Sequence, residues 1–591
     1  MKSFFLRHSF ALLLSLFVGA VSIAPSLLAP WSLGADYHGL PFLYQSDETV
    51  YLARIHEVLD GHRTITSPFF DGYKDTPSLQ LPFGEYFYAL PALLFGLFPV
   101  VLVSKFLFPA LLFLLAYFFL LQMFGVEGGE KERLFFALSG ATFAVLGYDF
   151  VDFRSLVSLL LRPEPFHLFL WTRLVNPITG GLILFSALLI FWELFRLPKR
   201  VYLLLGGMLL MLSSGYVFSF GVAFVVASML LVVSLVLGRS RSAVFFMGSI
   251  FLGILPFLIQ FLSLSLANVT SDPFSLTRNG LFFTHEPLPN KLLLVATILF
   301  ASASFLARRN IFSSKEGRKS DWWWFSVSIL TGLFIAFNEQ VITGMTIWPG
   351  HFVQYSIPLI ILVGFATLFH IVRPTFSFLA RVVAGGALAV SIAFGVWSAH
   401  AFQPKMPAYR SFQYLAPFFS WVNKNTPKDC VILARENLSG YIPAFTHCNV
   451  YYSEYVYSGV PLLRAEHGFF ALLRLKGISG SKIEEYFSIE KDQFINFIFS
   501  DWAEKYYDAS DPWLASLRDD KAFEERIVRE RARLSQEYRE FLLRDFELEL
   551  KRYKIDYMVL DTAIHETLPT DMKRFTEEVA SPKGFRVFKI I

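Results

Sequence analysis

The sequence has little charge and almost no cysteine. Of its 591 residues, 54% are hydrophobic and 17% are charged, and only Cys430 and Cys448 are cysteines. An ordinary globular domain has about a quarter charged residues, so a large part of this chain must be apolar. Two cysteines exclude a disulfide framework and a cysteine-based metal cluster. They either pair in an oxidising compartment or remain as two core thiols.

Several familiar motifs are also missing. No glycine-rich loop followed by Lys and Ser or Thr occurs, which argues against an ATP-driven pump. The segment His56-Glu57-Val58-Leu59-Asp60 falls short of a zinc-protease helix, because Asp60 stands where the second histidine is needed. The net charge of +4 is too small to indicate nucleic acid as a partner.

Long apolar runs are what the sequence has instead. A run of about 20 apolar residues is long enough to cross a bilayer. After the basic residues of Met1–His8, the run Phe10–Ala29 is longer than a usual signal-peptide core and predicts an uncleaved first span. The alternative is cleavage after a small residue near Ala24. About eleven spans are expected in all, near residues 10–29, 105–124, 134–149, 177–195, 201–213, 217–237, 243–265, 289–307, 322–338, 352–371 and 382–399.

The basic residues between these runs predict the orientation. If the N-terminus is cytoplasmic, every alternate loop is basic, and the short turns 213–216 and 338–350 have no Lys or Arg. This distribution follows the positive-inside rule. It requires that the apolar stretch Glu85–Val103, which contains two prolines, dips into the outer leaflet without crossing. We therefore expect a multi-pass protein of the inner membrane with a cytoplasmic N-terminus.

The composition changes after residue 400. Residues 1–400 are expected to form an all-α membrane domain, with outside loops at 30–84, 150–176 and 266–288, and residues 401–591 an extracytoplasmic α/β or α+β domain. The second part contains short apolar runs that predict strands, and a charged stretch with apolar residues at helical spacing that predicts a surface helix. The strands are expected at Cys430–Ala434, Asn449–Ser453, Tyr557–Asp561 and Phe585–Ile590, and the helix at 520–552.

The first outside loop contains the strongest candidate for chemistry. Residues Ser46–His62 predict a helix along the membrane surface, with Asp47 and Glu48 at its N-terminus. The helix dipole favours ionised carboxylates there, and an ionised carboxylate at the membrane boundary suits a general base for a hydroxyl acceptor. The alternative is that Asp47 is an N-cap and Glu48 a solvated acid of the first turn.

The sequence of residues 45–90 resembles the C-type (GT-C) glycosyltransferase superfamily, nearest to the lipid-A aminoarabinose transferases and the protein mannosyltransferases. The likeness lies in Asp47-Glu48-x-x-Tyr51, Arg54, Glu57, Gly61, Asp71-Gly72 and Pro82-x-x-x-Tyr86-x-Tyr88. Elsewhere it concerns only the architecture. Where many relatives have Lys-Pro-Pro, this chain has Gln80-Leu81-Pro82, so the lysine of that motif is absent.

The resemblance implies an inverting transferase that takes a sugar from a polyprenyl-phosphate donor. The expected acceptor is a hydroxyl of a lipid, a glycan or a protein, and membrane lipids are further expected partners. Asp47 is the expected general base, with Glu48 beside it in the acidic motif. The leaving phosphate needs cationic or hydrogen-bonding neighbours. The candidates are Tyr51, Arg54, Arg154, Arg162 and His351, within a wider set of outside residues that includes Lys74, Arg173 and His285.

A metal is a further possibility that the resemblance raises. Some C-type transferases place a second acidic motif in the second outside loop together with a metal, and Asp149-x-x-Asp152 is the matching pair here. The ion would be Mg²⁺ or Mn²⁺, the metals that suit carboxylate ligands. The alternative is that these acids form structural ion pairs with the arginines of the same loop.

Two other classes of function remain as hypotheses. A transporter or flippase of lipid-linked sugars would place ionisable residues inside its spans and often has inverted repeats. Here the acids lie in outside loops and no repeat is evident. A catalytically inactive relative that serves as an envelope scaffold is compatible with the same sequence.

Overall fold

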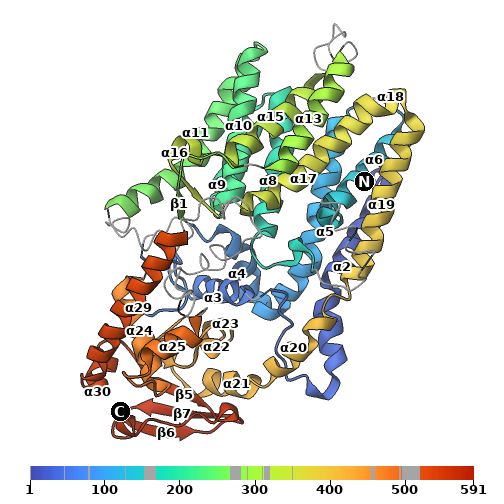
Figure 1. The fold of residues 1–591 in the computed structure, drawn as a ribbon. Helices are drawn as coiled ribbons and strands as arrows, with labels where there is room; N and C mark the ends of the chain where they lie inside the picture. The colour runs from blue at the N-terminus through green and yellow to red at the C-terminus, as the bar shows by residue number, and fades with distance from the viewer. Residues whose placement is uncertain are drawn as a thin grey trace.

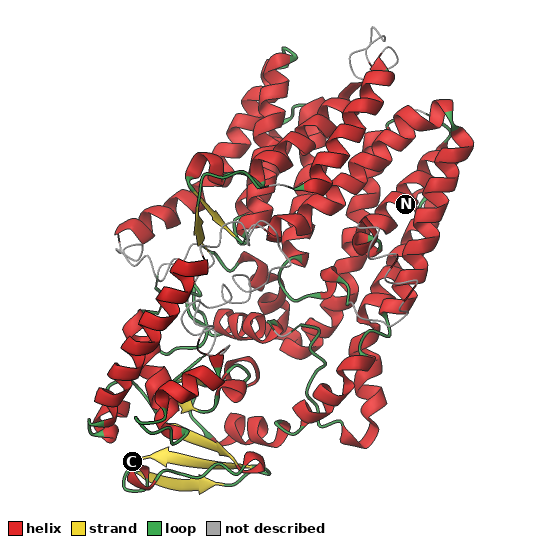
Figure 2. Ribbon diagram, in the orientation of Figure 1, coloured by secondary structure: helices red, strands yellow, loops and turns green. Residues whose placement is uncertain are grey.

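In a computed structural model, the chain forms a bundle of long helices with a small sheet domain at one end (Figure 1). Helices dominate, and most strands belong to the C-terminal part (Figure 2). The structure describes residues 2–45, 47–76, 80–126, 128–151, 157, 161, 168–266, 281–288, 290–308, 311, 320–348, 350–453, 460–491, 494 and 520–591.

Seven helices in the described residues are long and apolar enough to cross a membrane. They are α2 (Ser9–Leu33), α5 (Leu97–Phe124), α8 (Ile178–Arg196), α10 (Val217–Val236), α11 (Ser240–Leu266), α17 (Gly350–Thr367) and α19 (Ser377–Ser398). Three shorter apolar helices accompany them, namely α9 (Arg200–Ser213), α13 (Lys291–Leu306) and α15 (Asp321–Ala336). The chain is therefore a multi-pass membrane protein, while the expected number of about eleven spans is not confirmed.

Four further α-helices among the described residues of the bundle are short or carry charge at one end. They are α1 (Lys2–Arg7), α6 (Glu130–Leu146), α16 (Gln340–Thr343) and α18 (Arg373–Thr375). A two-stranded antiparallel ribbon joins the third outside loop to the turn before α17. It pairs β1 (Leu281–Phe283) with β2 (Met345–Ile347).

Two helices between α2 and α5 do not run with the bundle. α3 (Glu48–Leu59) and α4 (Phe83–Phe95) lie between the end of the spanning helices and the C-terminal domain (Figure 1). With 13 residues, α4 is about 20 Å long, which is too short to cross a bilayer. The stretch Glu85–Val103 was expected to stay out of the spans as a whole, and that expectation is correct only for its first part.

The second part of that stretch belongs to a spanning helix. Gly96 ends α4 with a positive φ of 80°, a backbone conformation that favours glycine, and α5 begins directly at Leu97. Pro99 lies in the first turn of α5, where a proline costs no helical hydrogen bond. The second span is therefore longer at its start than the run 105–124 predicts.

The C-terminal domain contains a five-stranded mixed sheet of order β4-β3-β5-β7-β6. Its strands are β3 (Val431–Leu433), β4 (Asn449–Val450), β5 (Tyr557–Asp561), β6 (Thr576–Ala580) and β7 (Phe585–Ile590). β3 pairs in parallel with β4 and β5, whereas β7 pairs antiparallel with β5 and β6. The expected α/β or α+β class is confirmed, and the mixture of parallel and antiparallel pairs combines both descriptions.

Helices cover this sheet and connect it to the bundle. They are α20 (Met406–Gln413), α21 (Ala416–Asn425), α22 (Glu436–Ser439), α23 (Ile442–Phe445), α24 (Leu462–Leu475), α25 (Ile483–Ile489), α29 (Asp520–Leu542) and α30 (Phe546–Lys551). The charged stretch 520–552, expected as one helix, is interrupted between α29 and α30. Asp545 starts the second helix, because its side chain accepts hydrogen bonds from the backbone N–H groups of Glu547 and Leu548.

Cys430 and Cys448 form a disulfide, with an S–S distance of 2.09 Å. Cys430 comes directly before β3 and Cys448 directly before β4, two adjacent parallel strands, so the bond joins the starts of both strands. The sequence was compatible with either a disulfide or two free thiols, and in the structure the two cysteines are paired. A disulfide in this part of the chain is also compatible with an oxidising compartment.

Replacing both cysteines with serine is expected to lower the free energy of unfolding by about 3 kcal/mol, the usual value for a loop of this length. Thermal unfolding in detergent measures this loss. Thiol labelling of the denatured, unreduced wild-type protein provides the control, since neither cysteine should react. Two reactive thiols in that sample would contradict the disulfide.

Candidate active site

The two acids at the start of α3 have different surroundings. Asp47 occupies the N-cap position, but its side chain makes no capping hydrogen bond. Its carboxylate instead forms an ion pair with Arg173, which follows the short helical turn Leu170–Thr172. Both side chains remain about a quarter exposed, at 26% for Asp47 and 22% for Arg173. The N-cap interpretation therefore fits the backbone position of Asp47 but not the use of its carboxylate.

Glu48 is completely buried. One of its oxygens lies 2.7 Å from the Lys105 ammonium group, and the other accepts the backbone N–H of Tyr44 at 2.8 Å. Lys105 also lies over the Tyr44 ring, 3.4 Å from its centroid. The alternative of a solvated first-turn acid is thus wrong for Glu48. Because both of its oxygens have partners, Glu48 fixes the start of α3 to α5.

Tyr44 anchors the chain just before the two acids to other parts of the structure. Its hydroxyl donates to the Ser22 carbonyl of α2 at 2.8 Å and accepts the N–H of Ser26 at 3.1 Å. Its carbonyl accepts a hydrogen bond from Lys405 at 2.5 Å. The chain just before Asp47 is therefore held by α2, by α5 and by the segment before α20.

Tyr51 extends the site along α3, one turn after the acid pair. Its hydroxyl bonds to the side chain of Asn176, and burial raises its pKa well above the ordinary value. Its ring centroid lies 5.9 Å from the guanidinium carbon of Arg173. Asn176 is 1% exposed. These side chains form a buried polar wall next to the ion pair.

Arg54 was expected to bind the donor phosphate, but it makes structural contacts. Its Nε donates to Glu85 of α4 at 2.5 Å, and its Nη1 donates to the carbonyl of Ile65 at 3.1 Å. Glu85 is fully buried, so the pair couples α3 to α4. The cation that the structure places beside the proposed base is Arg173.

His351 lies at the start of α17 among aromatic side chains. Its ring packs against Phe218 and Trp348, at centroid distances of 4.9 and 5.8 Å. Phe218 lies 5.0 Å from Tyr216. Burial raises the pKa of Tyr216, and the nearby charge of Arg173 acts in the opposite direction. A role for His351 in phosphate binding stays a prediction.

Three expected site residues lie outside the described residues. These are Arg154, Arg162 and Asp152, and the side chain of Asp149 is likewise not described. The proposed metal pair therefore stays a prediction. Across the described parts of the chain, no group of three or more His, Cys, Asp or Glu side chains lies together.

The C-terminal domain packs directly on the first outside loop. Lys428 lies 2.7 Å from Asp60 at the end of α3, and Lys74 bridges Glu57 at 2.8 Å and Asp429 at 3.5 Å. The backbone N–H of Val450 in β4 donates to the carbonyl of Phe69 at 2.9 Å. Through these contacts the C-terminal domain braces the loop that carries Asp47.

A pH-sensitive acid lies in this contact. Burial raises the pKa of Glu57 to about 7, although the Lys74 ammonium and His62 act to lower it and Asp60 acts to raise it. The folded protein therefore binds this proton more tightly than the unfolded chain does. The resulting stability is fully present below the ordinary pKa of a glutamate and is lost as the pH rises through about 7.

Glu57→Gln is expected to flatten this pH response by up to about 3 kcal/mol between pH 4.5 and pH 7. The comparison is the thermal unfolding of the purified protein at both pH values, wild type against variant. Glu577→Gln, at an exposed acid of β6, serves as the matched control and should keep the wild-type response. Equal pH responses of wild type and Glu57→Gln would contradict the assignment.

No protein-family model matches the chain, and no curated protein matches it. Among solved structures, it is similar to the crystal structure of ArnT from Cupriavidus metallidurans bound to undecaprenyl phosphate. The TM-score is 0.44 and the identity 11%, over 99% of this chain and 98% of that chain. The apo form of ArnT gives a TM-score of 0.36 and 15% identity, over 69% and 81%. ArnT is a C-type aminoarabinose transferase, the group that the sequence resembles. At scores this low, the roles of single residues rest on their own contacts.

Sequence reasoning assigned no role to Lys105 and did not distinguish Arg173 from the other candidate cations. Lys105 was the first residue of an expected span, and an ionisable residue inside a span is itself a signal for a buried partner. Arg173 was one of several outside cations without a distinguishing feature. Its position became evident only from the fold, because 126 residues separate it from Asp47.

Proposed function

We propose that this chain transfers a sugar from a polyprenyl-phosphate donor to an acceptor hydroxyl at the outer face of the inner membrane. The observation that carries the proposal is the contrast between two adjacent acids. Glu48 is buried with both oxygens bonded, whereas Asp47 is partly exposed and paired with Arg173, which is itself partly exposed. Of the two adjacent acids, Asp47 alone is therefore accessible to a substrate, and accessibility is what a general base requires.

In the proposed reaction, the acceptor oxygen attacks the anomeric carbon and its proton passes to Asp47. The bond between the anomeric carbon and the phosphate oxygen breaks, and polyprenyl phosphate leaves with the electron pair. Attack opposite to the leaving group inverts the anomeric configuration. Arg173 is suited to stabilise the phosphate, since its guanidinium is partly exposed and lies next to Asp47, the proposed general base.

The proposed orientation places the N-terminus in the cytoplasm and the C-terminal domain outside. Three features support it: the basic residues of alternate loops, the disulfide, and the common position of α3 and the C-terminal domain at one end of the bundle (Figure 1). The donor class follows from the sequence resemblance over residues 45–90. The compared ArnT structure holds undecaprenyl phosphate, a lipid of this class.

The direct test is transfer of label from undecaprenyl-phosphate pentoses and hexoses in membranes that contain the chain. We expect label to enter the lipid, glycan or protein fraction with the wild type and with Asp36→Asn, but not with Asp47→Asn. Asp36 is a suitable control because it is an exposed acid of the same loop that pairs with Arg410 at 3.1 Å. No transfer by correctly inserted wild-type protein would refute the proposal.

A further inference from the structure

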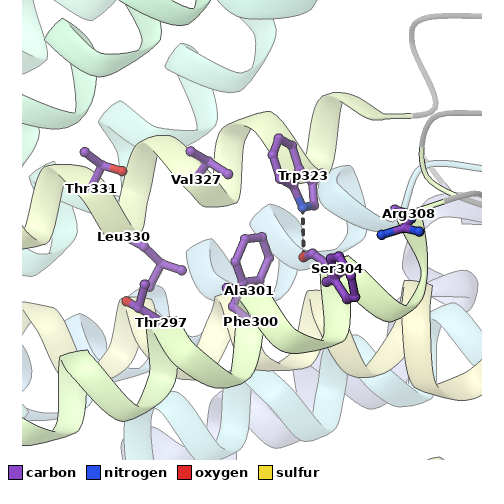
Figure 3. Close-up of a pocket in the computed structure, with 10 residues that line it drawn as sticks. Thr297, Phe300, Ala301, Ser304, Arg308, Trp323, Val327, Leu330 and Thr331 are labelled. Atoms are coloured by element: carbon purple, nitrogen blue, oxygen red, sulfur yellow. Dashed lines mark hydrogen bonds between the residues drawn. The ribbon is translucent and has the colours of Figure 1, made fainter.

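A groove lies between α13 and α15, away from the proposed active site. Its volume is about 410 Å³, within the range of roughly 300–1,000 Å³ typical of small-ligand sites. Apolar side chains form most of its wall, among them Phe300, Val327 and Leu330 (Figure 3). Both helices are apolar and stand in the membrane bundle, so the natural occupant is an amphiphile with an apolar chain.

The two ends of the groove differ in polarity. Figure 3 shows Arg308, Ser304 and Trp323 at one end and Thr297 and Thr331 at the other. The indole N–H of Trp323 donates to the Ser304 hydroxyl at 2.8 Å. Trp and Arg are typical of the headgroup level of a membrane. The Arg308 end is therefore the mouth of the groove.

Arg308 is exposed and lies over the Phe305 ring, 4.5 Å from its centroid. Among the residues that the structure describes, no carboxylate lies within ion-pair distance of its guanidinium. It is the first residue of the basic sequence Arg308–Lys319, which the positive-inside rule assigns to the cytoplasm. A positive charge at the mouth of an apolar groove matches an anionic headgroup.

The length of the groove indicates how much of a lipid it can hold. From Thr297 to Arg308, the rise of an α-helix gives about 16 Å. This is close to half of the hydrocarbon thickness of a bilayer, which is about 30 Å. The groove therefore matches one acyl chain of one leaflet, whereas an undecaprenyl chain is far longer.

We infer that this groove binds an anionic glycerophospholipid of the cytoplasmic leaflet, with its phosphate at Arg308 and one acyl chain along Phe300 and Leu330. The site lies at the opposite membrane face from the proposed donor site, so it is separate from the transfer reaction. Its expected ligand class is phosphatidylglycerol or a lipid of like charge.

Native mass spectrometry of the full chain in detergent tests the inference, with phosphatidylglycerol and phosphatidylcholine of identical acyl chains as probes. We expect tighter binding of phosphatidylglycerol to the wild type. Arg308→Gln should lower that affinity about tenfold, the usual effect of losing a charge-assisted hydrogen bond. Ala301→Trp, which fills the groove, should remove binding of both lipids at this site.

Each variant has a matched control. Arg241 also lies at the end of a membrane helix over a phenylalanine, at 5.6 Å from the Phe245 ring, but it does not line the groove. Ser302 neighbours Ala301 and is exposed outside the groove. Arg241→Gln and Ser302→Trp should bind phosphatidylglycerol like the wild type. Equal affinity of the wild type for both lipids, or equal losses in the controls, would overturn the inference.

Discussion

Asparagine at position 47 is expected to lower kcat for sugar transfer by about 10² to 10⁴, the range that a positioned general base contributes. Asn keeps the size of the side chain but cannot accept the proton of the attacking hydroxyl. The apparent affinity for the donor should stay the same or rise, because Arg173 loses its carboxylate partner and becomes available to the donor phosphate. A fall in kcat without a weaker donor affinity is the signature of a group that acts in the transition state.

The measurement is single-turnover transfer from a labelled polyprenyl-phosphate sugar, together with donor binding to the purified protein. Asp36→Asn, at an exposed acid of the same loop, should keep the wild-type kcat. Asp47→Glu should regain part of the activity, since it restores a carboxylate at a shifted position. If Asp47→Asn changed donor affinity but not kcat, the acid would have a binding role and the proposed mechanism would be wrong.

The local pattern of apolar residues was sufficient to predict several helices and strands. β5 and β7 have the bounds that the runs Tyr557–Asp561 and Phe585–Ile590 predict, because most of their residues are apolar and buried. The helix after Asp47 was also correctly predicted. β6 was missed because its residues Thr576–Ala580 are largely exposed at the sheet edge, so they carry little apolar pattern.

The partners of the site could not be predicted in the same way. Lys105 lies 57 residues from Glu48, and Arg173 lies 126 residues from Asp47. Neither distance has a local sequence signature, and charge alone does not rank the many outside cations. Arg54 illustrates the converse, because the family resemblance made it a candidate ligand of the donor phosphate, whereas the fold pairs it with Glu85.

The buried pair Glu48–Lys105 leads to the largest expected effect on stability. The side chains of Glu48 and Lys105 are 0% and 3% exposed, so removing one partner leaves an uncompensated buried charge. Lys105→Met alone is therefore expected to lower the free energy of unfolding by about 3–5 kcal/mol. The double variant Glu48→Gln/Lys105→Met should return close to the wild-type value, because it buries no charge. Thermal unfolding in detergent measures both.

The same double variant separates two roles for Glu48. The glutamine introduced at position 48 still offers a carbonyl oxygen to the N–H of Tyr44, and the methionine introduced at position 105 can pack on the Tyr44 ring. The frame that holds Asp47 is therefore retained. If Glu48 only positions α3, the double variant transfers sugar at close to the wild-type rate. A stable double variant that has lost transfer would place Glu48 in the chemistry, because its frame would be intact and only its charge missing.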